Sequence, residues 1–140
     1  MLWLSSCALP KIVIMEDTLT AEQHNDLGYV YEQRGMPDLA GKEYLLAAKK
    51  RDDWPVPYFN LGNLMYKMGD FRKSENFFRT SLHYDPNNPD VINNLANALL
   101  MQERHQEARQ MIEQALRIGS KKEYLETLEA VEKREGASPK

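Results

Sequence analysis

The chain has 140 residues, of which 42% are apolar and 28% are charged, with a formal net charge of −3 and an isoelectric point of about 5.6. This length suits one domain that buries most of its unfolded surface. The acidic balance argues against a nucleic-acid partner, because such surfaces carry a clustered basic face. One cysteine cannot form an internal disulfide, and no Cys or His cluster has metal-ligand spacing, so we expect no metal or other cofactor.

An apolar arm occupies residues 1–20, and its first 15 residues are too few to cross a membrane, which takes about 20. Within it, Leu4-Ser5-Ser6-Cys7 resembles the lipobox of bacterial lipoproteins, in which the cysteine carries lipid. A signal peptide needs a basic segment and an apolar segment of about 7 to 15 residues, whereas six residues precede Cys7. Two interpretations stay open: Cys7 is lipidated in a chain whose leader is truncated, or it is an incidental thiol on an apolar arm.

The first helical pair is predicted over residues 21–54. Thr20 is expected to cap the first helix, because Gln23 three residues later completes a capping box. A turn follows at Gly35, and Pro37 suits a helix start because its missing N–H would be unpaired there. The apolar and small positions of the two helices are Leu27, Gly28, Tyr31, Ala40, Tyr44 and Ala47.

The second pair, over residues 55–88, shows the pattern most clearly. Its first helix places apolar residues at the i, i+3, i+4, i+7 spacing of one helix face, and its second helix repeats this. Gly69-Asp70 supplies the turn, and Pro86 ends the second helix. The face positions are Tyr58, Leu61, Gly62 and Met65, followed by Phe71, Ser74, Phe78, Ser81 and Leu82.

A third pair, over residues 89–122, completes a repeat with a period of 34 residues. Such a period, with two amphipathic helices in each unit, is typical of a solenoid whose units bury their faces against each other. Equivalent positions are Leu27, Leu61 and Leu95; Ala40, Ser74 and Ala108; Tyr44, Phe78 and Ile112; and Ala47, Ser81 and Ala115.

Residues 123–135 carry an apolar stripe backed by acidic side chains, which predicts a helix that covers the end of the last unit. The stripe consists of Tyr124, Leu125, Leu128 and Val131. Residues 136–140 are expected to form a disordered tail.

The repeat resembles the tetratricopeptide repeat (TPR), whose W-x2-L-G-x2-Y, A-x3-F and P pattern it follows with Tyr58 in the Trp place and Ser74 in the first Ala place. The resemblance covers residues 21–122 and implies an all-α solenoid of three helix-turn-helix units plus a C-terminal capping helix. It departs from the pattern at Asp52 and Ser120 in place of the closing proline, at His24 in the opening aromatic place, and at Glu103 in place of a turn glycine.

In this family the first helices line a concave groove that binds a peptide or a partner protein. Asparagines recur there at two places, which resembles the asparagine ladder in the TPR region of O-linked N-acetylglucosamine transferase. Carboxamides both donate and accept hydrogen bonds, so a row of them can hold an extended peptide backbone; alternatively, asparagine is only a common polar filler. The predicted groove residues are Asp26, Asn60 and Asn94; Tyr29, Asn63 and Asn97; and the apolar Phe59, Tyr66 and Met101.

The carboxylate clamp of chaperone-binding TPR proteins uses Lys, Asn, Asn, Lys and Arg, and the resemblance places it at Asn25, Tyr29, Asn60, Asp90 and Asn94. Only Asn60 matches. Without cations a C-terminal carboxylate has nothing to pair with, so chaperone tails are disfavoured as ligands.

No enzyme activity is expected. His24, His83 and His105 are scattered, with His105 predicted in a turn, and surface or packing roles are expected for them. The sequence contains no phosphate-binding glycine loop, nucleophile elbow or H-E-x-x-H motif.

These patterns favour a protein-interaction scaffold that is lipid-anchored through Cys7 on the periplasmic side of a bacterial cell envelope, where it serves an assembly. The alternative is a soluble cytoplasmic adaptor that self-associates through the apolar arm over residues 1–15, docked on its own groove or a neighbour's. In both cases the partner is a protein or an extended peptide.

Overall fold

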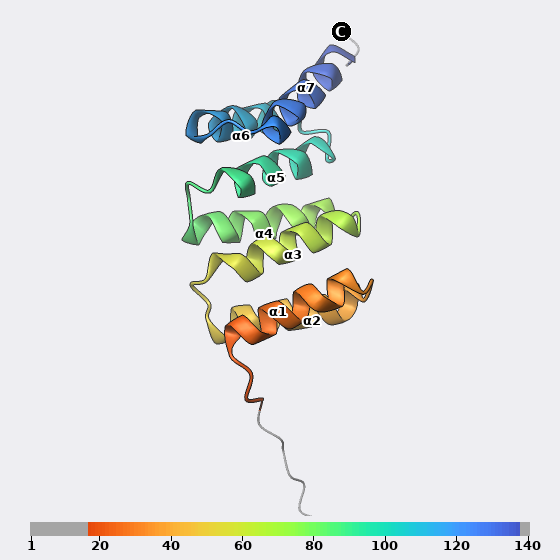
Figure 1. The fold of residues 1–140 in the computed structure, drawn as a ribbon. Helices are drawn as coiled ribbons and strands as arrows, with labels where there is room; N and C mark the ends of the chain where they lie inside the picture. The colour runs from red at the N-terminus through yellow and green to blue at the C-terminus, as the bar shows by residue number, and fades with distance from the viewer. Residues whose placement is uncertain (1–16, 138–140) are drawn as a thin grey trace, which may run out of the picture.

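The computed structural model describes residues 17–137, which form seven α-helices and, over that range, no strand. The helices follow one another along the stack in chain order, with α1 and α2 at one end and α7 at the other (Figure 1). They are α1 (Ala21–Gln33), α2 (Pro37–Lys50), α3 (Pro55–Lys67), α4 (Phe71–Tyr84), α5 (Pro89–Leu100), α6 (His105–Ile118) and α7 (Lys122–Ala137).

Each predicted unit is a helical hairpin. The most extensive contacts join α1 to α2, α3 to α4 and α5 to α6, and the hairpins meet through α2 with α3 and α4 with α5. The third hairpin is followed by α7, which packs on α6 and α5 at the far end of the stack. The fold class predicted from the 34-residue period, an all-α solenoid of three units and a capping helix, is confirmed.

Helix starts follow the expected chemistry. The Thr20 side chain accepts a hydrogen bond from the Gln23 amide, and the Gln23 side chain accepts one from the Thr20 amide, so the predicted capping box is present. The Asp70 side chain caps α4 by accepting a hydrogen bond from the Lys73 amide at 3.1 Å. Pro37 and Pro55 take the first helical position of their helices, where no backbone N–H is needed.

The three hairpin turns share one backbone geometry, although their residues differ. Gly35 and Gly69 have φ angles of 70° and 80°, and Glu103 takes the same left-handed region with a φ of 61°. Glycine adopts this region without steric cost, whereas a side chain adds strain. The prediction that placed His105 in a turn is wrong: because the third turn closes at Arg104, His105 is the first residue of α6.

Small residues let the two helices of each hairpin approach closely. A Cβ atom at Gly62 would overlap the ring of Phe78, and one at Gly28 would overlap the ring of Tyr44. Ser74 adds a buried hydrogen bond from its hydroxyl to the Gly62 carbonyl oxygen at 2.8 Å. Because Phe78 and Tyr44 are fully buried, neither ring has room to move aside.

α7 covers the end of the last hairpin, as the sequence predicts. Tyr124 and Val131 are buried against residues of α5 and α6. The bounds differ slightly from the expected 123–135, because α7 begins at Lys122 and continues through Ala137. Residues 136 and 137, expected in a disordered tail, are therefore helical, since a glycine close to a helix end costs little and helix ends are poorly fixed by sequence.

The residues just before α1 are tied to the first hairpin. The His24 side chain is buried, with Nε2 2.8 Å from an Asp17 carboxylate oxygen and Nδ1 2.7 Å from Glu43 Oε2. Lys50 donates to the Asp17 carbonyl oxygen at 3.1 Å. The rest of the predicted arm, Cys7 included, lies outside the described residues. Within residues 17–137 no helix is both long and apolar enough to cross a membrane.

Candidate functional site

The first helices of the units are joined side by side by asparagine hydrogen bonds. Asn60 of α3 donates to the side-chain oxygen of Asn25 of α1 at 2.8 Å, and Asn94 of α5 donates to that of Asn63 of α3 at 2.8 Å. The row ends where Asn97 of α5 donates to the Thr127 hydroxyl of α7 at 3.1 Å. The helices α1, α3, α5 and α7 therefore share one polar surface, called the groove surface below.

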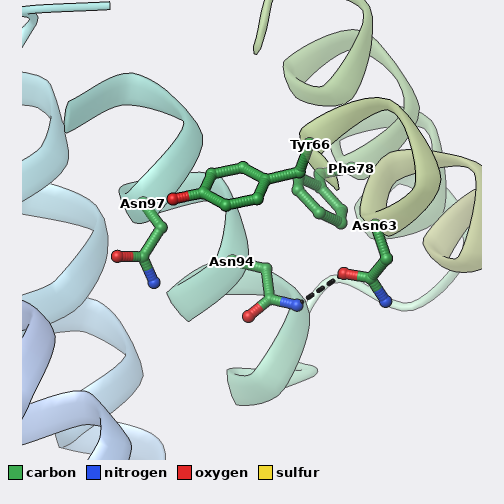
Figure 2. Close-up of a pocket in the computed structure, with 5 residues that line it drawn as sticks. All are labelled: Asn63, Tyr66, Phe78, Asn94 and Asn97. Carbon is green, nitrogen blue, oxygen red and sulfur yellow. Dashed lines mark hydrogen bonds between the residues drawn. The ribbon is translucent and has the colours of Figure 1, made fainter. Parts of the chain in front are cut away.

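Two hollows open on the groove surface. The first, of about 330 Å³, lies between α3 and α5, and the second, of about 290 Å³, lies between α1 and α3. They adjoin each other, because Asn63 and Tyr66 line both. The first is lined by Asn63, Tyr66, Phe78, Asn94 and Asn97 (Figure 2), and the second by Tyr29, Glu32, Gln33, Tyr44, Asn60, Asn63, Tyr66 and Lys67.

The first hollow has a row of three asparagines on one side and two aromatic residues on the other. Figure 2 shows the Asn94 and Asn63 side chains meeting across it, with the Tyr66 phenol reaching from α3 towards α5. Phe78 of α4 is fully buried and packs below them. Because Phe78 has no exposed surface, a ligand in this hollow would meet the carboxamides and the Tyr66 side chain.

The two charged side chains of the second hollow, Glu32 and Lys67, pair with each other. Glu32 accepts a hydrogen bond from the Tyr44 hydroxyl at 2.8 Å and one from the Lys67 ammonium at 2.6 Å. Burial, together with the Glu32 carboxylate, raises the pKa of the Tyr44 phenol, so Tyr44 stays protonated. Among the described residues that line the two hollows, Lys67 is the one cation, and its charge is already matched by Glu32. The hollows thus offer hydrogen bonds rather than net charge.

The structure brings six of the nine predicted groove residues together in these hollows: Tyr29, Asn60, Asn63, Tyr66, Asn94 and Asn97. The other three lie elsewhere. Asp26 is exposed on α1, Met101 caps the C-terminus of α5, and Phe59 packs on Phe78 and lines a separate hollow of about 240 Å³ with residues that include Asp85 and Asn88.

The sequence does not predict the pairing among the asparagines. The bonded pairs are 35 and 31 residues apart, so they join positions of neighbouring units that are offset from the 34-residue register. Asn25, Thr127 and the Glu32–Lys67 pair are missed for the same reason. These partners would be found by looking for pairs of polar residues whose separation differs from the 34-residue period by up to one helical turn.

The positions of a carboxylate clamp present no cation. Asn25 and Asn60 bond each other, and Asp90 lies one turn before Asn94 on α5, where Lys121 and Tyr124 bind its carboxylate. These two hydrogen bonds hold the pKa of Asp90 below its usual range. Asp90 therefore adds a negative charge at a place where the clamp uses a lysine.

A family model for the tetratricopeptide repeat matches residues 65–131, which run from the end of α3 into α7. The matched segment carries tetratricopeptide repeats. This agrees with the 34-residue period, with the glycine and serine contacts inside the hairpins, and with the seven-helix stack.

One relative is human tetratricopeptide repeat protein 6, which is 30% identical over 82 residues. The match covers 59% of this chain and 16% of the human protein, so the chain spans a small part of that relative's length.

Solved structures of TPR domains share the fold. The first TPR of Spaghetti (RPAP3), bound to an HSP90 peptide, superposes with a TM-score of 0.81 at 17% identity over 89% of this chain and 99% of that one. The second TPR domain of human RPAP3, in complex with an HSP70 peptide, superposes with a TM-score of 0.77 at 16% identity. The match covers 80% of this chain and 94% of that one. At this level of identity the similarity concerns the arrangement of the helices.

Proposed function

We propose that this chain is a protein-interaction scaffold that binds an extended peptide segment of a partner protein along the groove surface. The observation that carries the proposal is the pair of adjoining hollows, which place Asn60, Asn63, Asn94 and Asn97 along α3 and α5. The TPR domains that share the fold hold chaperone peptides, which supports a peptide as the kind of ligand.

The carboxamides keep binding capacity beyond their mutual hydrogen bonds. Each can donate two hydrogen bonds and accept about two. Asn97 already uses its amide group to donate to the Asn93 carbonyl oxygen and the Thr127 hydroxyl, so the spare capacity lies with Asn60, Asn63 and Asn94. The bond between Asn94 and Asn63 uses one donor of the first and one lone pair of the second. The mutual bonds fix the side-chain orientations in advance, and the remaining donors and acceptors face a peptide backbone that presents alternating N–H and C=O groups. Each such bond contributes about 0.5 to 1.5 kcal/mol net.

Aromatic rings provide the apolar part of the site. Tyr29 is 57% exposed on α1, and Tyr66 stands between the two hollows. A tyrosine ring gives a large contact area at low conformational entropy cost. We expect these rings to pack against ligand side chains that leave the backbone at alternate positions.

The neutral groove selects against acidic tails. The HSP90 peptide SRMEEVD held by the TPR of Spaghetti carries three acidic side chains. In this chain the Lys67 charge is matched by Glu32, and the place of a second clamp cation is taken by Asp90. We infer that the ligand is an internal, largely uncharged segment and not a chaperone C-terminus.

Binding rather than catalysis is inferred as the role of the hollows. Their titratable groups Glu32, Tyr44 and Lys67 are engaged with one another. Within residues 17–137 no cluster of three or more His, Cys, Asp or Glu side chains is placed to hold a metal ion.

The test begins with selection of a phage-displayed library of random linear peptides on the immobilised protein. The enriched peptide is then titrated by fluorescence anisotropy against wild type, Asn60→Ala and Asn25→Ala. Both variants lose the same hydrogen bond, but only Asn60 lines a hollow. We expect Asn60→Ala to weaken binding about fivefold and Asn25→Ala to weaken it less than twofold, because one lost hydrogen bond to the ligand is worth about 1 kcal/mol.

Equal affinities for Asn60→Ala and wild type would contradict the proposal, as would enrichment of peptides that end in acidic residues. The synthetic peptide SRMEEVD serves as the negative control, and we expect no saturable binding to it.

Membrane attachment through Cys7 stays a prediction of the sequence, because the residue lies outside the described part of the chain. Growth of the source cells with a radioactive fatty acid tests it. Label on the wild-type chain that disappears in Cys7→Ser would support the lipid anchor. An unlabelled wild-type chain would leave the soluble adaptor as the interpretation.

A further inference from the structure

A further hollow, of about 470 Å³, lies between α2 and α3 and shares no lining residue with the two hollows of the groove surface. Leu45 and Met68 are each 52% exposed there, and together they form an apolar patch at the mouth of the hollow, a kind of surface that often marks an interaction site. The hollow is lined by Pro37, Asp38, Gly41, Lys42, Leu45, Leu46, Lys49, Met65 and Met68, and we call it the α2–α3 hollow.

The equivalent junction one unit later is polar. Glu75, Arg79 and Gln102 take the positions of Gly41, Leu45 and Met68. The Glu75 carboxylate accepts from Arg79 at 2.9 Å and from Gln102 at 3.0 Å, so hydrogen bonds close that junction. An apolar hollow is therefore not a property of the repeat.

The third junction, between α6 and α7, is polar as well. Arg109 takes the position of Gly41 and binds the carboxylate of Glu135 from α7. Charged side chains thus bridge the second and third junctions, whereas Leu45 and Met68 are exposed at the first.

We propose that the α2–α3 hollow seats the apolar run of residues 12–15, Ile-Val-Ile-Met, from this chain's own N-terminal arm. The arm enters the described structure at Asp17, which is held by His24 and by the Lys50 ammonium at the C-terminal end of α2. The neighbouring Lys49 lines the hollow. The structure thus fixes the end of the arm beside the helix that carries the hollow.

The arm has the length that this site requires. Lys49 and Pro37, at opposite ends of the hollow's α2 wall, are about 18 Å apart along the helix axis. An extended chain covers this distance with about six residues. Counting back from Asp17, those are residues 11–16, and the four in the middle of that stretch are the uncharged apolar run.

Tethering favours the chain's own arm over other occupants. A segment linked by a few residues is present at an effective concentration in the millimolar range, well above that of a second copy in dilute solution. Burial of branched aliphatic side chains against Leu45 and Met68 then removes apolar surface of both partners from water. The inference does not rest on the proposed peptide site, because the two surfaces share no residue.

The test uses the full chain with Lys11→Cys and Cys7→Ser, so that one nitroxide label can be attached near the apolar run. Methionine methyl NMR signals report where the label lies, with Met65 and Met68 in the hollow and Met101 and Met111 on α5–α6 as internal references. We expect the label to broaden the Met65 and Met68 signals strongly and to leave the Met101 and Met111 signals sharp. Adding Leu45→Glu should restore sharp Met65 and Met68 signals.

Absence of selective broadening at Met65 and Met68 would overturn the proposal, and so would broadening centred on Met101. A mixed sample separates the chain's own arm from a second copy: methyl-labelled protein without a nitroxide is combined with unlabelled protein that carries it. Sharp signals in the mixture support the arm of the same chain. Broadened signals there would overturn the proposal in favour of exchange between copies.

Discussion

Two equivalent junctions of the repeat differ in chemistry. One joins α2 to α3, and the other joins α4 to α5 at positions 34 residues later. At the first, Gly41 and Met68 leave an open apolar hollow; at the second, Glu75 and Gln102 form a hydrogen-bonded contact. The repeat therefore specifies where the helices lie but leaves the chemistry of the outer contacts free to differ between units.

Inside the hairpins the units are alike. Gly28 faces the Tyr44 ring in the first unit as Gly62 faces the Phe78 ring in the second, and both rings are fully buried. Changes inside the hairpins should thus affect the two units equally, whereas changes at the junctions should not.

The largest effects are expected from Gly62→Ala and Gly28→Ala. In each case the added methyl group overlaps a buried ring, which should destabilise the fold by about 2 to 3 kcal/mol despite the better helix propensity of alanine. Urea unfolding of the two variants measures this. Losses that differ severalfold between the variants would show that the hairpins are not equivalent.

Glu75→Ala and Gly41→Ala should change stability in opposite directions. Glu75 is 8% exposed and accepts hydrogen bonds from three side chains, Arg79, Gln102 and Arg104, so its removal should cost about 2 kcal/mol. At Gly41 a Cβ meets only Leu64, at 3.4 Å, and alanine should add about 0.5 to 1 kcal/mol of stability through helix propensity. Chemical denaturation of the two variants measures the change in unfolding free energy of each. Changes of the same sign would contradict the contrast between the junctions.

The polar junction should weaken in acid. Burial acts to raise the pKa of Glu75, but hydrogen bonds from Gln102, Arg79 and Arg104 outweigh it and hold this pKa below its ordinary value. A carboxyl with a lowered folded pKa stabilises the protein above its unfolded pKa of about 4.3, and this contribution is lost as the pH falls through the folded pKa.

We therefore expect the stability advantage of wild type over Glu75→Gln to be greatest near neutral pH and to shrink below about pH 4. Thermal unfolding of both proteins across that range measures the difference. An advantage that does not change with pH would show that the charge of Glu75 contributes nothing to the junction.

The smallest effect is expected at the third turn. Glu103→Gly relieves a left-handed backbone conformation but increases the freedom of the unfolded chain, so a net stabilisation of about 0.5 kcal/mol is expected. Gly69→Ala, at the equivalent turn with a φ of 80°, should instead destabilise by about 1 kcal/mol. A loss of stability in Glu103→Gly would show that the Glu103 side chain makes a contact that outweighs the strain.

The fold could be predicted from the sequence because burial inside a hairpin repeats with the period. Gly62, Ser74 and Phe78 meet inside one unit, so local spacing is enough to place them. The same register also placed Asn60 and Asn94 at equivalent positions on neighbouring first helices.

The rest depends on contacts between units, which the register alone does not determine. Asn60 pairs with Asn25 and Asn94 with Asn63, since the stacking of neighbouring hairpins shifts facing side chains by up to a helical turn. The α2–α3 hollow could not be predicted either, because Gly41 and Met68 belong to different units and neither residue indicates a hollow by itself.

The most direct test of the proposed peptide site is an NMR titration of the enriched linear peptide that follows the side-chain NH2 signals of the asparagines. Our account predicts that the signals of Asn60, Asn63, Asn94 and Asn97 shift together and saturate, while the methyl signal of Met68 in the α2–α3 hollow stays in place. Shifts confined to Met65 and Met68, with the asparagine signals unchanged, would contradict it.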